Sequence, residues 1–127
     1  MQTPLPGKPV RGSRTGRPIM ALLDLLGRRW VLRILWELHA EILGFRALQE
    51  RCERMSPSVL SQRLRDLTRA RIVEQDERGD YRLTAPGAHL LSALLPLHKW
   101  ADDWAKSAAT GFPPAGCSSP KKRSARR

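Results

Sequence analysis

Apolar residues recur at helical spacing along most of this chain, in segments separated by glycines. The clearest segment is 28–40, whose apolar residues define one face of a helix: Trp30, Val31, Ile34, Leu35 and Leu38. A shorter helix is expected over 18–26, with Pro18 at its first position, where the missing N–H costs no hydrogen bond. Another short helix is expected over 45–53, and its shared apolar face consists of Phe45, Leu48 and Cys52.

The dipeptide Ser56-Pro57 marks the start of the next helix, because a hydroxyl N-cap followed by proline is a strong start signal. The pattern predicts that this helix spans 56–70. Two short strands are expected after it, over 72–76 and 81–84, and Gly79 favours a tight turn between them.

The last apolar segment predicts a long helix over 86–109, which Pro96 is expected to kink. Its leucines occupy more than one face, which is more than packing on a small core requires. The order of elements predicts a fold that is mainly α with a small β-hairpin.

Composition places the chain among single-domain globular proteins, since it has 127 residues, 41% of them hydrophobic and 28% charged. Its formal net charge of +11 favours a polyanionic partner, either nucleic acid or an anionic membrane surface. Two cysteines exclude a disulfide framework. Because no apolar run approaches the roughly 20 residues of a membrane-spanning helix, and none at the N-terminus is typical of a signal peptide, we expect a cytoplasmic protein without a membrane partner.

The charge is concentrated at the two ends of the chain. Residues 1–17 carry +4 and residues 111–127 carry +5, both without an acid, whereas 18–110 carry only +2. Both ends are rich in Pro, Gly and Ser, so we expect a basic N-terminal arm (1–17) and C-terminal tail (110–127) without fixed structure around a domain at 18–109. Such arms either strengthen DNA binding through phosphates or only improve solubility.

The helix over 56–70 has a polar face suited to DNA. At about 100° per residue its leucines face the core, and the opposite face carries Ser58, Gln62, Arg65 and Arg69, with Ser61 at its flank. Gln can form paired hydrogen bonds with adenine and Arg with guanine, while Ser suits a phosphate or a base. A short helix, a turn and this helix together match a helix-turn-helix, although the polar face is also compatible with ordinary solvation.

The hairpin occupies the position of the wing in a winged helix. Arg78 at its tip is a candidate phosphate contact, ranked below the helix because residues 72–84 sum to −2.

Four stretches resemble the HxlR-type winged helix-turn-helix regulators of bacteria, which are relatives of the MarR type. In order along the chain they are Leu26-Gly27-Arg28-Arg29-Trp30 leading into Ile34-Leu35, Phe45-Arg46-Ala47-Leu48, the segment from Met55 to Leu67, and Tyr81-Arg82-Leu83-Thr84 with Gly87, Leu91, Pro96 and Trp100. The resemblance implies a sequence-specific transcriptional regulator, more often a repressor, that binds double-stranded DNA as a homodimer with helix 56–70 in the major groove. Ser56 and Arg46 join the candidate DNA contacts on this basis.

The resemblance also implies that the first and last helices form the dimer. The candidate interface residues are Leu22, Leu90, Leu94, Leu97, Trp100 and Trp104. The alternative for the two tryptophans is that they close the core of the monomer. An unidentified small-molecule effector is a further candidate partner.

Two positions depart from the family pattern. Many members carry a Cys-Pro pair before the first helix, and this chain has Arg17-Pro18, so sensing through a cysteine there is excluded. The turn of the hairpin, residues 77–80, is shorter than in many members, which weakens the case for a groove contact.

No motif indicates catalysis, a cofactor or a metal. Cys52 is expected to be a buried apolar residue, Cys117 lies in the basic tail, and the three histidines lack ligand spacing. Neither a phosphate-binding loop nor a nucleophile with a base is present, so we expect no enzyme. Two alternative functions remain, a nonspecific nucleic-acid-binding protein driven by its basic ends and a winged helix used as a protein-interaction module.

Overall fold

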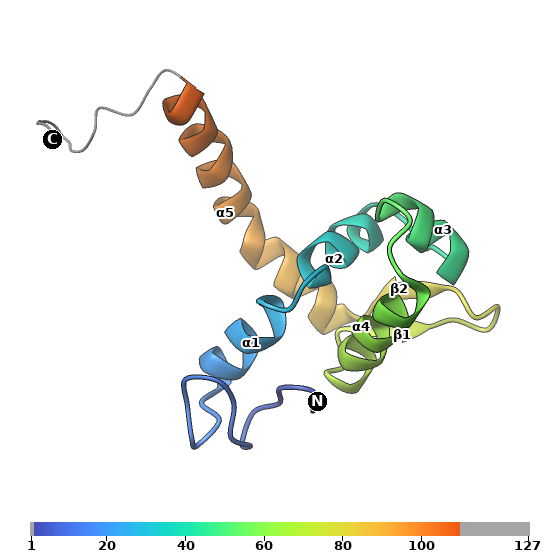
Figure 1. Cartoon of the computed structure of the whole chain (residues 1–127), viewed down its shortest axis with the longest axis horizontal. Coiled ribbons are helices and arrows are strands. Elements are labelled where there is room, and N and C mark those ends of the chain that lie inside the picture. Colours follow the sequence, from blue (N-terminus) through green and yellow to red (C-terminus); the bar gives the residue numbers. More distant parts are fainter. Residues whose placement is uncertain (1, 110–127) are drawn as a thin grey trace, which may run out of the picture. The chain divides into compact units, whose positions relative to one another are not determined.

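The computed structural model describes residues 2–109. Within them the chain forms five helices and a two-stranded antiparallel sheet (Figure 1). In order, the elements are α1 (Pro18–Leu26), α2 (Val31–Ala40), α3 (Phe45–Arg51), α4 (Pro57–Arg69), β1 (Val73–Gln75), β2 (Tyr81–Leu83) and α5 (Ala85–Ala109). This is the predicted mainly α architecture with a small hairpin, in the predicted order.

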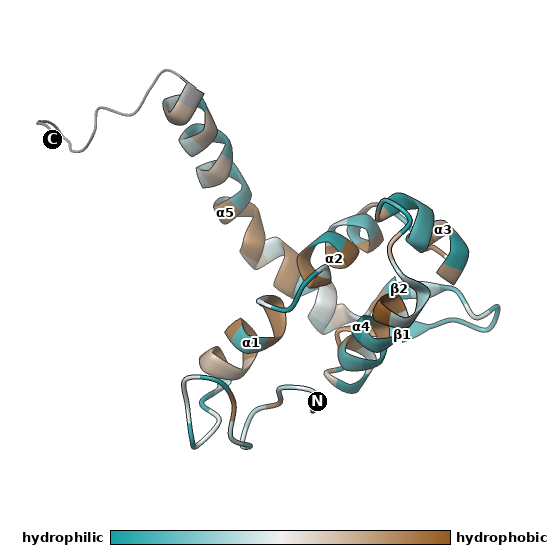
Figure 2. Cartoon of the chain, viewed as in Figure 1, coloured by the Kyte–Doolittle hydropathy of each residue, from teal (hydrophilic) through white to brown (hydrophobic). Residues whose placement is uncertain are grey.

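The chain divides into two compact units between Ser92 and Ala93, and each is described by itself. The core of the first unit is built from the apolar faces that the spacing predicts. Its fully buried side chains come from α2, α3, α4 and β1, and include Ile34, Leu35, Leu48, Leu60, Leu64, Leu67 and Val73. Figure 2 shows hydrophobic and hydrophilic residues alternating along these helices, and a hairpin whose turn is hydrophilic.

The second helix begins later than predicted. Trp30 has a φ of 75°, in the left-handed region, and occupies the N-cap position, so α2 starts at Val31 rather than at residue 28. The residues between α1 and α2 form a tight turn, in which the Val31 N–H donates to the Arg28 carbonyl at 3.2 Å. The periodicity of apolar residues could not show this boundary, because Trp30 continues the apolar spacing of α2 although its backbone is not helical.

The hairpin has a partner that the apolar pattern did not predict. β1 and β2 pair with Val73 opposite Leu83, and Leu43, just before α3, adds a bridge to Tyr81. The Tyr81 N–H donates to the Leu43 carbonyl at 2.7 Å, and the Leu43 N–H donates to the Tyr81 carbonyl at 3.1 Å. These bonds attach the hairpin to the residues that precede α3, and so fix the wing beside the helix-turn-helix.

Helix α5 starts at a threonine cap. The Thr84 hydroxyl accepts a hydrogen bond from the Gly87 N–H at 3.0 Å and donates to the Arg71 carbonyl at 2.7 Å. Gly87 is buried, and a Cβ there would lie 2.2 Å from the Ile72 carbonyl oxygen, so the close approach requires glycine. The helix continues to Ala109 with Pro96 inside it. Whether this proline kinks the helix stays a prediction.

Residues 2–17 differ from the expectation of an arm without fixed structure. They form a loop, named here the N-terminal loop, in which the Gly7 N–H donates to the Gly16 carbonyl at 3.0 Å. Thr3 is only 8% exposed. The composition of the segment misled the prediction because its glycines, with positive φ at Gly7, Gly12 and Gly16, supply turns of a defined loop. Residues 110–127, the expected C-terminal tail with Cys117, lie outside the described residues.

Cys52 is fully buried between α3 and the core, as expected from its spacing with Leu48. Burial raises the pKa of the Cys52 thiol, which lowers the fraction of reactive thiolate at neutral pH.

We predict that Cys52 reacts slowly with a thiol reagent in the folded protein. In a Cys117→Ala variant at pH 7.5, modification by a disulfide reagent should be slower by about 100-fold or more than in the same variant unfolded in urea, because the domain must open first. The absorbance of the released thiolate measures the rate. Modification of the folded variant as fast as that of the unfolded one would contradict the burial.

Candidate nucleic-acid interface

A tight turn joins α3 and α4. Glu53 and Arg54 both have positive φ, 57° and 56°, and the Arg54 N–H donates to the Gln49 carbonyl at 2.9 Å. The Gln49 side-chain amide then donates to the Met55 carbonyl at 2.9 Å, and Met55 is buried beneath the turn. The turn is therefore held from both sides, which fixes the angle at which α4 leaves it.

The start of α4 uses the predicted cap. The Ser56 hydroxyl accepts a hydrogen bond from the Val59 N–H at 3.5 Å, and it lies 2.9 Å from the Ser58 hydroxyl. Pro57 is the first helical residue, where it leaves no N–H unpaired. Both serines are exposed at the amino end of α4, where hydroxyl and backbone N–H groups favour an anion such as a phosphate.

The outward face of α4 is basic and free of acid. Ser58, Arg65 and Arg69 are exposed, and Ser61 and Gln62 are half-buried at its edges. The helix contains one acid, Asp66, and it is fully buried. Neither Arg65 nor Arg69 forms an ion pair with any residue among 2–109, so both guanidiniums face solvent with their charge uncompensated.

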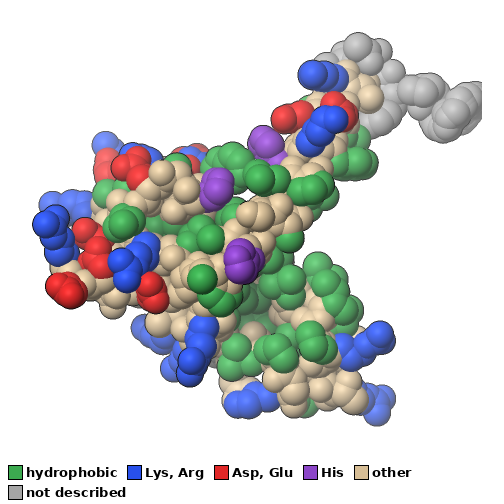
Figure 3. All heavy atoms as spheres, turned by 180° about the vertical axis from the view of Figure 1, so that it is seen from behind, with side chains coloured by type: hydrophobic (Ala, Val, Ile, Leu, Met, Phe, Trp, Pro, Cys, Tyr) green, Lys and Arg blue, Asp and Glu red, His purple; other side chains and the backbone are tan. Residues whose placement is uncertain are grey.

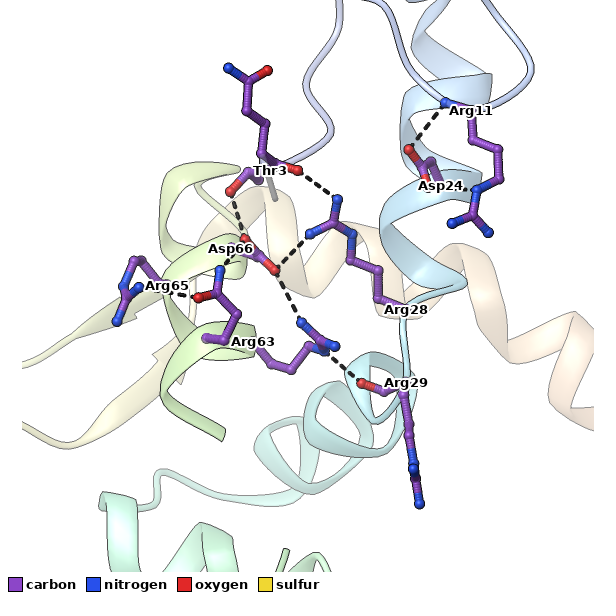
Figure 4. Close-up of polar contacts among 10 residues, drawn as sticks. Thr3, Arg11, Asp24, Arg28, Arg29, Arg63, Arg65 and Asp66 are labelled. Atoms are coloured by element: carbon purple, nitrogen blue, oxygen red, sulfur yellow. Dashed lines mark hydrogen bonds and ion pairs between the residues drawn. The ribbon is translucent and has the colours of Figure 1, made fainter. Parts of the chain in front are cut away.

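Asp66 accepts contacts from three parts of the chain (Figure 4). The Arg28 guanidinium donates to its Oδ2 at 3.1 Å, and the Thr3 hydroxyl donates to its Oδ1 at 2.7 Å. Within α4, the Arg63 guanidinium lies 3.6 Å from Oδ2 and the Gln62 amide donates to Oδ1 at 3.4 Å. A fully buried carboxylate with this many donors is satisfied, and it ties the inner edge of α4 to the N-terminal loop and to the turn after α1.

The same cluster reaches the outward face through Gln62. The Gln62 amide oxygen accepts a hydrogen bond from Arg65 Nη1 at 3.2 Å, while its NH2 group donates to Asp66. Gln62 therefore links the buried cluster to the exposed guanidinium. Helical spacing places Gln62 and Arg65 on one face, but it did not predict that Gln62 is held by Asp66.

Arg63 makes a second connection between α4 and the turn after α1. Its Nε donates to the Arg29 carbonyl at 2.9 Å while its Nη1 faces Asp66. Thr3, Arg28, Arg63 and Asp66 are thus positioning residues that the sequence pattern did not reveal. The only local signal was the i, i+3 spacing of Arg63 and Asp66, because the contacts with Thr3 and Arg28 join residues 63 and 38 positions apart.

A groove of about 350 Å³ lies between α4 and the hairpin. No acid lines it. Its lining consists of the rings of Phe45 and Tyr81, Gln75 of β1, and five residues of α4, all polar except Leu64: Ser61, Leu64, Arg65, Thr68 and Arg69. The wing-side edge of the basic face is therefore hollowed and uncharged apart from the two arginines.

The hairpin itself is compact and mixed in charge. Asp76 closes its turn, since its Oδ1 accepts hydrogen bonds from the N–H groups of Arg78 at 2.9 Å and Asp80 at 3.0 Å. Across the strands Arg82 pairs with Glu74 at 2.8 Å. Arg78 is exposed at the tip, and Arg46 is exposed on α3. Of the two arginines of the hairpin, Arg82 is therefore paired, whereas Arg78 forms no ion pair with a carboxylate among residues 2–109.

Each of the two units also exposes apolar side chains. On α1, Ile19 and Leu23 are 55% and 53% exposed, and Leu22 is half-buried. In the second unit Leu97, Trp100 and Trp104 are 58%, 60% and 51% exposed, and the two indole rings stack at 5.9 Å. Leu90 and Leu94 are half-buried. The role of the two tryptophans, at a dimer interface or in the core of the monomer, stays a prediction.

Residues 2–109 contain neither a candidate metal site nor a candidate membrane-spanning helix. Their His, Cys, Asp and Glu side chains form no group of three that could hold a metal ion. In the same part of the chain, the helices are too short or too polar to cross a membrane.

A helix-turn-helix followed by a hairpin beside its second helix defines the winged helix-turn-helix class of DNA-binding regulators. The family model for HxlR-like helix-turn-helix proteins matches residues 25–109, and the chain belongs to this family. It is 32% identical over 88 residues to YvaP of Bacillus subtilis (strain 168), an uncharacterized HTH-type transcriptional regulator, with 65% of this chain and 82% of that protein covered. The chain is accordingly a transcriptional regulator with a helix-turn-helix DNA-binding domain.

Solved structures support the same fold. The quinone-bound YodB of B. subtilis matches with a TM-score of 0.63 and 29% identity, covering 68% of this chain and 96% of that one. A possible HxlR family transcriptional factor of Thermoplasma volcanium GSS1 matches with a TM-score of 0.60 and 25% identity, covering 70% and 85%.

We predict that Asp66→Ala strongly destabilises the domain, because it leaves the Arg28 guanidinium, 11% exposed, without its partner. Loss of one member of a buried pair costs about 3–5 kcal/mol of unfolding free energy. Urea denaturation followed by circular dichroism measures the loss. The matched control is Glu74→Ala, which removes a carboxylate from the half-exposed pair with Arg82 and should cost less than about 1 kcal/mol. Equal losses in the two variants would show that the buried cluster is not a principal support of α4.

Proposed function

We propose that this regulator binds a specific DNA sequence with α4 in the major groove. One observation carries the proposal: the exposed face of α4 presents Ser58, Arg65 and Arg69, while the only acid of the helix is buried against Arg28. An α-helix fits the major groove, and an outward face without a carboxylate avoids repulsion from the phosphates.

The side chains divide into those that contact bases and those that contact the backbone. Arg65, supported by Gln62, is the proposed contact to a guanine edge, since a guanidinium can donate two parallel hydrogen bonds to O6 and N7. Gln62 itself suits an adjacent adenine, and Ser61 and Arg69 lie at the edges of the same face. The proposed phosphate contacts are Ser56 and Ser58 at the start of α4, Arg46 on α3 and Arg78 on the hairpin.

We propose that the DNA-binding form is a homodimer. The support is the apolar surface that one copy exposes. On α1 this surface lies around Leu22, and on α5 it lies around Leu97, Trp100 and Trp104, with Leu90 and Leu94 on the same helix. Burial of such side chains between two copies contributes roughly 1.5–3 kcal/mol for each large residue. A dimer would also place two copies of α4 in successive major grooves, which doubles the sequence recognised.

The proposed effect on transcription is repression. Occupation of a site near a promoter is sufficient to exclude other proteins, and it needs no contact surface beyond the DNA-binding and dimer faces. The signal is not a cysteine in front of α1, because Arg17 occupies that position and Pro18 begins the helix.

The second candidate function is nonspecific binding of nucleic acid through the basic ends of the chain. The observation in its favour is the charge of +4 in residues 1–17 and +5 in residues 111–127. Removal of residues 111–127 separates the two functions, because nonspecific binding should then lose most of its affinity, whereas a specific regulator keeps its preference for an operator.

We predict that Arg65→Ala and Gln62→Ala each weaken operator binding by roughly 5- to 150-fold, the equivalent of about 1–3 kcal/mol for a paired base contact. Gel shifts with the upstream region of the protein's own gene, against a random duplex, measure affinity and selectivity. Lys99→Ala, which removes one positive charge from α5, is the matched control and should bind as the unaltered chain does. If both α4 variants keep full affinity and selectivity, α4 does not recognise the operator.

We predict that Leu97→Glu prevents dimer formation, because it places a charge in the proposed apolar interface. Size-exclusion chromatography with light scattering should give the mass of a monomer, with operator affinity reduced in parallel. The control is Leu32→Glu, at an α2 leucine that is 49% exposed and outside the proposed interface. A dimeric Leu97→Glu protein would exclude this part of α5 from the interface.

A further inference from the structure

The N-terminal loop is a built structure beside α4. Two backbone hydrogen bonds between Val10 and Ser13, at 2.9 and 3.0 Å, close its tip, and the Gly7–Gly16 bond closes its base. Gly16 has a φ of +71°, and a Cβ there would lie 2.1 Å from the Lys8 carbonyl oxygen. The position of Lys8 therefore depends on a glycine at residue 16.

Contacts of Gln2, Thr3 and Arg11 hold this loop to the rest of the first unit. The Thr3 hydroxyl donates to Asp66, and the Gln2 carbonyl accepts a hydrogen bond from Arg28 Nη2 at 2.6 Å. Farther along, the Arg11 N–H donates to Asp24 of α1 at 3.3 Å. The same carboxylate that fixes α4 therefore fixes the start of the loop, so the loop and α4 have a defined relative position (Figure 4).

A groove of about 260 Å³ lies between the N-terminal loop and the carboxyl end of α4. It is lined by Gln2, Thr3, Leu5, Lys8 and Arg69, and so contains two cationic side chains and no acid. Neither Lys8 nor Arg69 forms an ion pair with another described residue, and both are exposed. Two unneutralised cations that share one groove favour an anion between them.

The groove lies on the opposite side of α4 from the hairpin. Arg65 and Arg69 border the groove beside the hairpin, and Arg69 also borders the groove beside the loop, where Asp66 anchors Thr3. Figure 1 shows the start of the chain on one side of α4 and the hairpin on the other. The two flanks differ in charge, since residues 72–84 sum to −2 and residues 1–17 to +4. In Figure 3, Lys and Arg side chains border the part of the surface that holds the loop and α1, with no acid visible around them.

We propose that the N-terminal loop is a second, basic wing that binds the DNA backbone, with Lys8 and Arg69 holding a phosphate in the groove between loop and α4. The proposal rests on the proposed function, because it requires α4 to face DNA. The ammonium group of Lys8 is a point charge on a flexible stem, which suits a phosphate and carries no base preference. The loop therefore supplies the backbone contact that the acidic hairpin supplies poorly, and it adds affinity without selectivity.

The test measures the salt dependence of binding for Lys8→Ala with both an operator duplex and a random-sequence duplex. Log affinity falls as log salt rises, and removal of one phosphate contact makes this fall less steep, by about 0.9 in slope for each protomer. At about 0.1 M salt this corresponds to roughly tenfold weaker binding for each phosphate that Lys8 no longer neutralises. Both duplexes should be affected equally, so the ratio of their affinities should not change. Circular dichroism checks that each variant is folded.

Two further variants separate position from charge. Gly16→Ala keeps every charge but displaces the backbone of Lys8. It should make the salt dependence less steep by as much as Lys8→Ala does. Lys99→Ala removes an equal charge from α5 and should keep the unaltered slope. The proposal is overturned if Lys8→Ala keeps the full slope, if Lys99→Ala lowers it as much, or if Gly16→Ala binds unchanged. Failure of the proposed function gives a different result: the chain without any substitution binds the operator no more tightly than the random duplex. In that case the salt dependence with the random duplex still tests the contact made by the loop.

Discussion

The buried carboxylate of Asp66 is the interaction on which the arrangement of this domain depends. It is fully inaccessible, and its donors come from the N-terminal loop, from the turn after α1 and from α4 itself. A buried charge is costly unless it is paired and hydrogen-bonded, so these elements must stay in place for the fold to be stable. The consequence is that α4 is oriented by polar contacts on one edge and by its leucines on the other.

The placement of Asp66 also explains why the outward face of α4 is cationic. The helix has three arginines and one acid, and the acid is paired inside with Arg28 and Arg63. Arg65 and Arg69 are left without a counter-charge on the side that faces solvent. The positive surface of the helix is thus a result of where its acid is buried, which a count of charges alone would not show.

Much of the fold could be predicted from the sequence, because the elements depend on local patterns. The spacing of Leu60, Leu64 and Leu67 fixes the inner face of α4, and Ser56-Pro57 marks its start. The features that could not be predicted depend on contacts between distant residues: the bridge of Leu43 to Tyr81, the left-handed Trp30, and the bond from Thr3 to Asp66. For the site, the residue types of the polar face followed from periodicity, whereas the coupling of Gln62 to Asp66 required the tertiary structure.

The anchoring of Thr3 has a practical consequence for work with this protein. Because Gln2 contacts Arg28 and Thr3 contacts Asp66, any peptide fused in front of them starts close to α4 in space. An N-terminal affinity tag or fusion partner would therefore compete for space at the proposed DNA-binding face, and an acidic tag would also weaken its positive field. The amino end of this chain lies beside the proposed DNA-binding helix, so purification handles are better placed elsewhere.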